Sequence, residues 1–531
     1  MTRNRITLAV AVTAALGLTA CTGQAGPSGP GGSKGELVDG QTFTYAVATD
    51  PGSLDPHSTV LRAARGVNRF LYGQLINLND KGDAIPFLAQ KWTADTTTAT
   101  FTLRQDLTCS DGSPLTASQV ADNFNHVGDP AKKSPLLNVF VKPGTKATAD
   151  DAARTVTVTS GAPDAFLLRN LGTLPIACGK GLTDRKRLTA GKDGTGMFVM
   201  SGAAPNDHYT LTRRKDINWG PGDWDPDQRG LPDKVVIRVI PNETTSANLL
   251  LSGEINAAAV NGPDKERLLA QTVFHDDTQI SVGQLWYNQA DGRPGQEPEV
   301  RRALTQALDL NQIGQVLTGG TGKKSTGMVT VDPKPCTDDT VSGNLPEHDT
   351  AAAAKSLEAA GWVAGSGGVR AKDGRKLKLT VLYPTQLGPT EAAAAELIQK
   401  TWAELGVDVT LKGVDSPGLN TALFDTGEWD VSMAPVGANL PSVVVGFVSG
   451  PVPPGGTNFA HIDNQKYSAA VAKAANKVGA EGCPEWAEAE KALIDDVDAV
   501  PYYNTVEPTF GAGAEFRVDD GLDPASIRMY K

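Results

Sequence analysis

The side chain best placed for covalent chemistry is the thiol of Cys21, which directly follows Leu18-Thr19-Ala20. A cysteine after small residues at the end of an apolar run can accept a diacylglycerol, and its freed amine can accept a further acyl chain. Two or three acyl chains hold a protein firmly on a membrane, whereas one chain binds only weakly. We therefore expect Cys21 to be a lipidation site through which the mature chain is anchored.

The segment before Cys21 has the composition of an export signal. Arg3 and Arg5 precede an apolar run over residues 6–18, which is short for a membrane span. We predict that residues 1–20 are a lipoprotein signal peptide, so that the chain is lipid-anchored on the extracytoplasmic face of the cell membrane. An ordinary signal peptide with a coincidental cysteine is the alternative. Residues 21–38, rich in Gly, Ser and Pro, are predicted to be a flexible tether.

The other four cysteines are expected to form disulfides, because their number is even and the compartment outside the cytoplasm is oxidising. Three connectivities are open, and we favour Cys109 with Cys178 and Cys336 with Cys483, since each pair then falls inside one of the two lobes predicted below. A metal site is the competing interpretation. It is disfavoured because the four cysteines are far apart in sequence and lack a histidine at ligand spacing.

The sequence offers no positive sign of catalysis. The six histidines are dispersed without metal-ligand spacing, and no Gly-x-Ser-x-Gly nucleophile motif is present. Residues 319–324 resemble a phosphate-binding loop, but the first glycine is missing at the required offset and Lys324 replaces the Ser or Thr. We therefore predict no catalytic residue, no metal site and no cofactor.

Composition limits the class of protein. The chain has 531 residues and a formal net charge of −11, which makes nucleic acid an unfavourable partner. After Cys21 the sequence contains no second stretch long enough to cross a bilayer. The body from about residue 39 onward is too long for one core and suits two or three domains. Abundant Ala, Gly, Thr and Asp with little Ile or Lys is associated with high-GC Gram-positive bacteria.

Hydrophobic periodicity predicts an α/β protein. Residues 377–383 alternate as a strand, residues 391–405 have a helical apolar face ending at Gly406, and residues 407–411 alternate again. Strand, helix and strand in this order indicate a parallel pair with a right-handed crossover. Further strands are predicted at 41–48 and 234–240, and further helices at 245–251, 298–308 and 350–360.

Short motifs are spread over nearly all of the mature chain. They are Asp50-Pro51-Gly52-Ser53-Leu54-Asp55-Pro56, Gln74 to Leu78 with Trp92, Phe101 to Arg104, Asp111-Gly112, Leu115 to Val120, Ile240-Pro241-Asn242, Ser252 to Ile255, Arg301 to Asp309, Ala360-Gly361-Trp362 and Gly427 to Val431. In their order and spacing these motifs resemble the extracytoplasmic solute-binding proteins of ABC transporters, family 5, the oligopeptide, dipeptide and nickel class. At Gly194-Thr195-Gly196 the chain continues with Met197-Phe198 where the family commonly has Pro-Tyr.

The resemblance implies a two-lobe periplasmic-binding-protein-like fold (type II, cluster C) with an inserted subdomain in the first lobe. Lobe I would hold residues 39–285 and 500–531, with the insertion at about 86–210, and lobe II would hold residues 286–499. The implied function is capture of a small-molecule ligand, foremost an oligopeptide, between the lobes of a monomer. The closed form would deliver this ligand to an ABC permease and ATPase.

The resemblance also implies positions that contact the ligand. Trp286, Tyr287 and Asn288 match the segment that crosses between the lobes, and Tyr502 and Tyr503 match the returning segment. For each of these the alternative is packing of the hinge. Ser53 and Leu54 match the turn whose backbone pairs with an extended ligand, which is a form of strand addition. A plain surface turn is the alternative there.

Asn439 stands where the peptide binders of the family typically carry an Asp that pairs with the α-ammonium of the ligand. A neutral amide lacks the charge-assisted bond that makes such a contact strong. Val436 also stands where a Trp is usual. Either another acid, such as Asp415 or Asp463, meets the amine, or the ligand is not a peptide with a free amine.

Two alternatives therefore stay open beside peptide uptake. The first is a lipoprotein that senses a peptide signal without feeding a transporter. The second is a carrier of a non-peptide ligand such as an opine, an oligosaccharide or a metal chelate. In each case we expect the lobes to close around the ligand, because contacts made only in the closed state shift the equilibrium towards closure.

Overall fold

The computed structural model describes residues 35–271, 273–365, 367–519 and 521–531. The predicted signal peptide, the predicted lipidation site Cys21 and most of the predicted tether lie outside these residues. Leu37 already pairs with Tyr530, and the backbone N of Val38 donates to Met529 O at 3.0 Å. The folded body therefore begins slightly before the predicted position 39, because the C-terminal segment supplies a pairing partner that local composition does not reveal.

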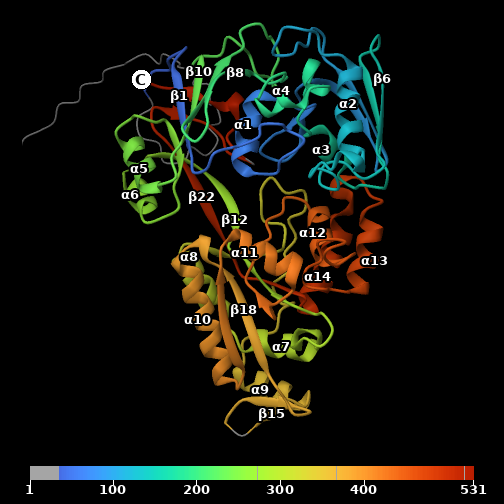
Figure 1. The fold of residues 1–531 in the computed structure, drawn as a ribbon, viewed down its shortest axis with the longest axis vertical. Coiled ribbons are helices and arrows are strands. Elements are labelled where there is room, and N and C mark those ends of the chain that lie inside the picture. The colour runs from blue at the N-terminus through green and yellow to red at the C-terminus, as the bar shows by residue number, and fades with distance from the viewer. Residues whose placement is uncertain (1–34, 272, 366, 520) are drawn as a thin grey trace, which may run out of the picture.

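Two lobes, each built on a mixed sheet, lie one above the other along the long axis (Figure 1). The predicted two-lobe α/β architecture is thus confirmed. The sheet of the first lobe has eight strands, and seven of them follow one another in an unbroken order. That order is β12 (Phe274–Ser281), β22 (Tyr503–Gly511), β11 (Ala257–Ala259), β1 (Thr42–Val47), β10 (Lys234–Val239), β9 (His208–Arg213) and β8 (Phe198–Ala204), while β14 (Lys323–Lys324) pairs with β22.

The predicted strands at 41–48 and 234–240 form the parallel pair β1–β10, in which Phe43 lies opposite Val235. Both side chains are fully buried, as alternating apolar residues on one sheet face require. Helix α5 (Glu243–Leu251) begins where the side chain of Asn242 accepts a hydrogen bond from Thr245 N at 2.8 Å. Helices α1 (Arg62–Leu71) and α6 (Asp264–Ala270) also belong to this lobe.

A subdomain is inserted into the first lobe, at the right of Figure 1. Its four-stranded sheet has the order β4 (Ala89–Ala94), β5 (Thr98–Leu103), β7 (Thr155–Thr159) and β6 (Lys146–Asp150). Helix α2 (Ala117–Gly128) packs on β6 and β7, and α3 (Leu167–Gly172) and α4 (Arg185–Thr189) follow. A disulfide joins Cys109 to Cys178 inside this region.

The second lobe is built on a five-stranded sheet. Its order is β19 (Asp408–Val414), β18 (Lys378–Pro384), β20 (Val431–Ser432), β13 (Gln284–Tyr287) and β21 (Ala499–Pro501). Strands β18 and β19 are parallel and are joined by α10 (Pro389–Glu404), so the predicted strand–helix–strand unit is confirmed. The predicted helices at 298–308 and 350–360 are α7 (Pro298–Gln306) and α9 (Thr350–Ala359), and α8 (Leu310–Thr318) lies between them.

A helical region completes the second lobe beneath the inserted subdomain (Figure 1). It contains α11 (Ser416–Asn420), α12 (Pro441–Val448), α13 (Gln465–Ala474) and α14 (Cys483–Asp495). A second disulfide joins Cys483, the first residue of α14, to Cys336. Smaller sheets are formed by β2 (Ile76–Leu78) with β3 (Ala84–Pro86), by β15 (Val363–Ala364) with β16 (Arg370–Lys372) and β17 (Arg375–Lys376), and by β23 (Ala514–Glu515) with β24 (Arg528–Met529).

The chain passes between the two large sheets at residues 282–283, from β12 to β13, and at Tyr502, from β21 to β22. The predicted lobe boundaries were 285/286 and 499/500. Gly283 has a φ of +138°, and a Cβ atom there would lie 2.8 Å from Met433 O. Both the backbone angle and the close approach therefore require glycine at the first crossing.

The lobes also touch away from these crossings. Ala165 and Phe166 of the inserted subdomain form a buried apolar cluster with Leu440, Ala474 and Trp486 of the second lobe. The rings of Phe166 and Trp486 stack with their centroids 6.0 Å apart. The two lobes are therefore closed on each other. Among the described residues, the helices are all too short or too polar to span a bilayer.

Candidate functional site

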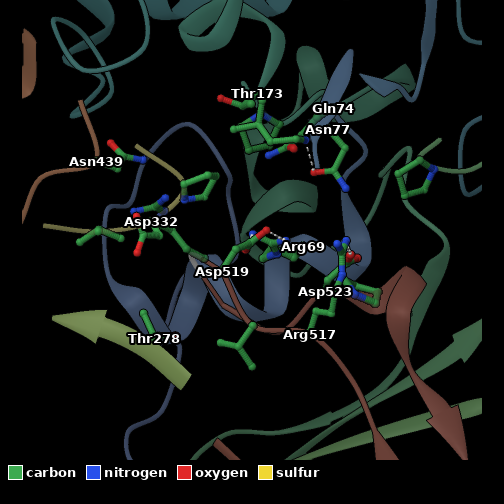
Figure 2. A pocket seen from close by; sticks show the side chains of 18 of the residues that line it. Arg69, Gln74, Asn77, Thr173, Thr278, Asp332, Asn439, Arg517, Asp519 and Asp523 are labelled. Atoms are coloured by element: carbon green, nitrogen blue, oxygen red, sulfur yellow. Dashed lines mark hydrogen bonds and ion pairs between the residues drawn. The ribbon is translucent and has the colours of Figure 1, made fainter. Parts of the chain in front are cut away.

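A cavity of about 530 Å³ lies between the two lobes (Figure 2). Most of its wall comes from the first lobe and the inserted subdomain. The second lobe contributes Val331, Asp332, Pro333 and Asn439. A volume of this size is typical of sites that enclose a small organic ligand.

One wall of the cavity is the free edge of a sheet. Strand β12 is the terminal strand of the eight-stranded sheet, and it pairs only with β22 among the described strands. Four consecutive residues of β12, numbers 276–279, line the cavity. Residues on both faces of the strand can do so only if the cavity runs along its edge. Figure 2 shows Thr278 rising from this strand into the cavity.

The cationic side chains of the cavity are held by carboxylates or by backbone. Arg69 forms a two-point ion pair with Asp519, and Arg517 pairs with Asp523 (Figure 2). Arg517 also pairs with Asp80. These pairs join α1 and residues 79–83 to the C-terminal segment. They fix the wall of the cavity through residues that lie more than 400 positions apart.

Arg169 in α3 links the two lobes at the edge of the cavity. Its Nη1 donates to the backbone oxygen of Pro333 at 2.8 Å. Burial lowers the pKa of Arg169 to about 10, and Asp519 partly offsets this effect. The guanidinium is still protonated at neutral pH, so it spans the lobe interface as a half-buried cation.

Two oxygen atoms in the wall have no hydrogen-bond partner among the described residues. They are Asn68 Oδ1 on α1 and Thr278 Oγ1 on β12. Asn68 is 4% exposed and Thr278 is 9% exposed. An unpaired buried polar atom costs about 1–3 kcal/mol, so these atoms indicate a place where a ligand group completes the hydrogen bonding.

The wall from the second lobe is held together by backbone hydrogen bonds. Thr330 N and Val331 N both donate to Ala438 O at 3.0 Å. This contact brings residues 331–333 beside Asn439, and Figure 2 shows Asp332 and Asn439 on the same side of the cavity. Asp332 is exposed, and the structure gives its carboxylate no partner among the described residues.

Of the residues predicted from sequence to contact the ligand, Asn439 lines this cavity and the others do not. Trp286 and Tyr287 lie in β13 and are fully buried in the core of the second lobe. Trp286 Nε1 donates to Ala434 O at 2.8 Å, and Tyr287 Oη lies 2.8 Å from Thr305 Oγ1. Their hydrogen-bonding groups are thus already used inside the protein.

Asn288 and Tyr502 are also buried. Asn288 Nδ2 donates to Trp429 O at 2.9 Å. Tyr502 lies at the second crossing, where its Oη has no hydrogen-bond partner among the described residues. Burial raises the pKa of Tyr502, and the negative charge of Glu391 raises it further.

Ser53 and Leu54 precede Pro56, which lines the cavity, but neither does so itself. The backbone N of Leu54 donates to Thr189 O at 3.2 Å. Asp415 and Asp463, the acids considered as substitutes at Asn439, are exposed and lie outside the cavity wall. Asp415 instead caps α11 by accepting a hydrogen bond from Gly418 N at 2.9 Å.

Sequence reasoning missed most of the cavity wall. Arg69, Asn68 and Thr278 carry no local motif, and the pairing of Arg69 with Asp519 joins positions 450 residues apart. A usable signal was the segment from Arg517 to Asp523, where four charged residues follow Phe516. Within the described residues, no group of three or more His, Cys, Asp or Glu side chains is arranged to hold a metal ion.

Comparison with known proteins gives a family match. The model of the bacterial extracellular solute-binding proteins, family 5 (Middle), matches residues 83–449 of this chain. This range includes most of the inserted subdomain, β12, β13 and most of the second lobe. The match therefore covers both sides of the cavity.

Individual relatives span most of the chain. The periplasmic murein peptide-binding protein MppA of Escherichia coli (strain K12) is 26% identical over 501 residues, covering 88% of this chain and 88% of that protein. Protein XP55 of Streptomyces lividans is 28% identical over 392 residues, covering 71% of this chain and 67% of that protein. A substrate-binding protein of Microbacterium hydrocarbonoxydans, solved with 4-hydroxybenzoate hydrazide, has a TM-score of 0.73 and 26% identity, covering 92% of this chain and all of that structure.

Proposed function

This chain belongs to the bacterial extracellular solute-binding proteins of family 5, and from that premise we propose that it is the substrate-binding lipoprotein of an ABC importer. It captures a ligand, foremost an oligopeptide, between its two lobes and delivers it to a membrane permease with its ATPase. The observation that carries this proposal is the cavity of about 530 Å³, because its wall is completed by residues of both lobes.

A site shared by two lobes couples ligand binding to closure. Asp332 and Asn439 reach the ligand from the second lobe, whereas Asn68 and Thr278 reach it from the first. A ligand that contacts all four stabilises the closed state, since the open state offers only one set of contacts at a time. The crossings at residues 282–283 and at Tyr502 are the places where the chain bends as the lobes move.

A peptide is the foremost ligand for two reasons. MppA, which covers 88% of the chain, is by name a murein peptide-binding protein. The free edge of β12 along the cavity offers backbone groups to an extended ligand, and such strand pairing is indifferent to ligand side chains. Asn439 is placed so that its amide contacts the ligand from the opposite wall.

The anchor and the partners follow from the same proposal. Acyl chains on Cys21 hold the monomer at the extracytoplasmic face of the cell membrane, and the segment predicted from sequence as a tether, residues 21–38, links this anchor to the folded body. The closed lobes dock on the permease. The negative net charge of the chain gives no attraction to anionic lipid head groups, so in this proposal the acyl chains hold the protein at the membrane.

A non-peptide ligand is the second candidate. The Microbacterium hydrocarbonoxydans protein, 26% identical, was solved with 4-hydroxybenzoate hydrazide, a compact aromatic molecule that is not a peptide. An opine, an oligosaccharide or a metal chelate also belongs to this candidate class. A peptide-sensing lipoprotein would use the same cavity but would have no permease partner.

The first test is to identify the molecules that the protein carries. The chain from residue 22 onward is purified from a rich culture and denatured, and the released small molecules are identified by mass spectrometry. We expect a mixture of short peptides. A single non-peptide species would contradict the peptide proposal and favour the second candidate. Pull-down of the lipidated full chain with its permease would separate uptake from sensing.

A further inference from the structure

The charged side chains that line the cavity differ in whether they already have a partner within the protein. Its four arginines all have protein partners: Arg69 has Asp519, Arg517 has Asp80 and Asp523, Arg169 has the backbone oxygen of Pro333, and Arg65 is also engaged. An anionic ligand would have to compete with these partners. Among the described residues of the cavity wall, every arginine is therefore already engaged, and none is free to bind a carboxylate or phosphate of a ligand.

The carboxylates of the wall are engaged as well, with one exception. Asp519, Asp80 and Asp523 are in the ion pairs just named. Asp276 accepts a hydrogen bond from Val518 N at 2.6 Å, and Asp277 lies 2.8 Å from His275 Nδ1. Asp332 has no such partner among the described residues, and it is the only ionisable residue that the second lobe contributes to the described wall.

The two buried side-chain atoms of the wall that lack a partner among the described residues are also oxygens. Asn68 Oδ1 and Thr278 Oγ1 are buried without a partner. A carboxylate and an amide oxygen can only accept hydrogen bonds, and a hydroxyl can accept as well as donate. Three groups of one cavity wall that accept hydrogen bonds thus lack a partner among the described residues, and a ligand rich in N–H donors would match them.

The geometry points to a cationic ligand: we propose that Asp332, beside Asn439, binds an ammonium group of the ligand from the second lobe, while Asn68 and Thr278 accept from its other donors. This inference rests on the proposed capture function and adds the chemical class of the ligand and the residue that selects it. Because Asp332 and Asn68 lie on opposite lobes, the ammonium contact is made only when the lobes close. An uncharged ligand would therefore close the lobes less effectively.

The test compares two peptide libraries that differ only at the amino terminus, which is a charged ammonium group in one library and a neutral acetylated amide in the other. Random tripeptides with free N termini and the same tripeptides after N-acetylation are mixed in equal amounts with the chain from residue 22 onward, which contains every residue that the structure describes. Bound ligand is first removed by unfolding and refolding. Retained peptides are then separated by ultrafiltration and quantified by mass spectrometry. Spermidine serves as a non-peptide cation in a parallel sample.

Asp332→Asn is the decisive variant, because it removes the charge and keeps the shape. Asp338→Asn is the matched control, since Asp338 is an exposed carboxylate on the same loop but outside the cavity wall. We expect the native chain to prefer free-amine peptides, and Asp332→Asn to bind them about 10- to 100-fold more weakly, as loss of one charge-assisted hydrogen bond predicts. Asp338→Asn should bind like the native chain.

The outcomes separate this inference from the capture function. Equal retention of both libraries, or unchanged affinity in Asp332→Asn, would overturn the role of Asp332 and leave peptide capture intact. If the native chain retains neither library, peptide capture fails. In that case the spermidine sample decides. If the native chain retains spermidine and Asp332→Asn does not, Asp332 is a cation site for a non-peptide ligand. If the native chain does not retain spermidine either, the proposed cation site is overturned.

Discussion

Phe166 of the inserted subdomain stacks on Trp486 of the second lobe, with ring centroids 6.0 Å apart and an interplanar angle of 28°. The backbone oxygen of Ala165, the residue before Phe166, accepts a hydrogen bond from Gly479 N at 2.7 Å. These contacts lie away from the two chain crossings. They therefore hold the lobes together at the far side of the cavity, where an open form would separate them.

Phe166→Ala is expected to shift the chain towards an open form. Loss of a buried aromatic side chain removes about 1.5–3 kcal/mol of apolar burial, and here the burial exists only while the lobes are closed. Small-angle X-ray scattering of the ligand-free chain should show a larger radius of gyration. Phe274→Ala is the control, because Phe274 packs on Phe516 within the first lobe. An unchanged radius in Phe166→Ala would contradict the role of this contact.

The stability of the chain is expected to fall on acidification because of His57. This side chain is fully buried, its Nε2 lies 2.9 Å from Pro175 O, and its Nδ1 lies 3.3 Å from the guanidinium of Arg185. Burial, followed by the charge of Arg185, lowers the pKa of His57 to about 4. The neutral ring suits both contacts, since Nε2–H donates and Nδ1 accepts.

The sign of this effect follows from the two pKa values. Between pH 6.5 and 4 the unfolded chain binds the proton and the folded chain does not, so stability decreases as pH falls through this window. The loss reaches about 3 kcal/mol below pH 4. Urea unfolding of the native chain and of His57→Gln at pH 7, 5 and 4 measures this fall in the free energy of unfolding. The free energy of unfolding of His57→Gln should fall less between pH 7 and pH 4 than that of the native chain. The control His348→Gln, at an exposed position, should show the same fall as the native chain.

Sequence patterns predicted local elements better than the site. The unit β18–α10–β19 was found because Leu379 and Val381 alternate into a core and Ile398 and Trp402 share one helix face. Such periodicity needs no information from distant residues. The same patterns could not distinguish the wall of a cleft from the core of a lobe, because aromatic side chains are expected in both. Trp286 and Tyr287 were predicted in the cleft wall, and the structure buries them fully in the core.

The cavity wall depends on contacts that no sequence window contains. Asp332 comes beside Asn439 because Thr330 N and Val331 N bond to Ala438 O, a pairing between segments more than 100 residues apart. The two acids considered as substitutes at Asn439, Asp415 and Asp463, are exposed and lie outside the cavity wall. The roles predicted for Ser53, Leu54, Asn288 and Tyr502 stay predictions.

Glu391 in α10 is expected to cost stability at neutral and alkaline pH. The side chain is 3% exposed, its Oε2 has no hydrogen-bond partner among the described residues, and burial raises its pKa to about 8. Above pH 4.5 the unfolded chain releases a proton that the folded chain keeps, so stability decreases as pH rises from 4.5 to 8.

Glu391→Gln removes this titration. We expect the variant to be more stable than the native chain by about 3 kcal/mol at pH 7 and nearly equal to it at pH 4. The control is Glu396→Gln, an exposed position on the same helix. Chemical unfolding at both pH values measures the difference. If Glu391→Gln were more stable than the native chain by the same amount at pH 4 and at pH 7, the stabilisation would come from packing and not from removal of the charge.

The disulfide Cys336–Cys483 is expected to support the ligand site as well as the fold. Cys336 lies four residues after Asp332, and the bond ties this loop to the first residue of α14. Replacing both cysteines with alanine should lower the free energy of unfolding by about 2–5 kcal/mol. It should also weaken ligand binding, because the wall segment 331–333 is then held by fewer contacts.

The matched control is the double alanine variant of Cys109 and Cys178, whose disulfide lies inside the inserted subdomain. It should lose stability to a comparable extent. Its effect on binding should be smaller, since neither cysteine lines the cavity or joins the segment that carries Asp332. Denaturant unfolding and retention of the free-amine tripeptide library measure the two effects separately. Equal losses of binding in the two double variants would mean that general loosening of the fold, and not the tie between Cys336 and α14, weakens the site.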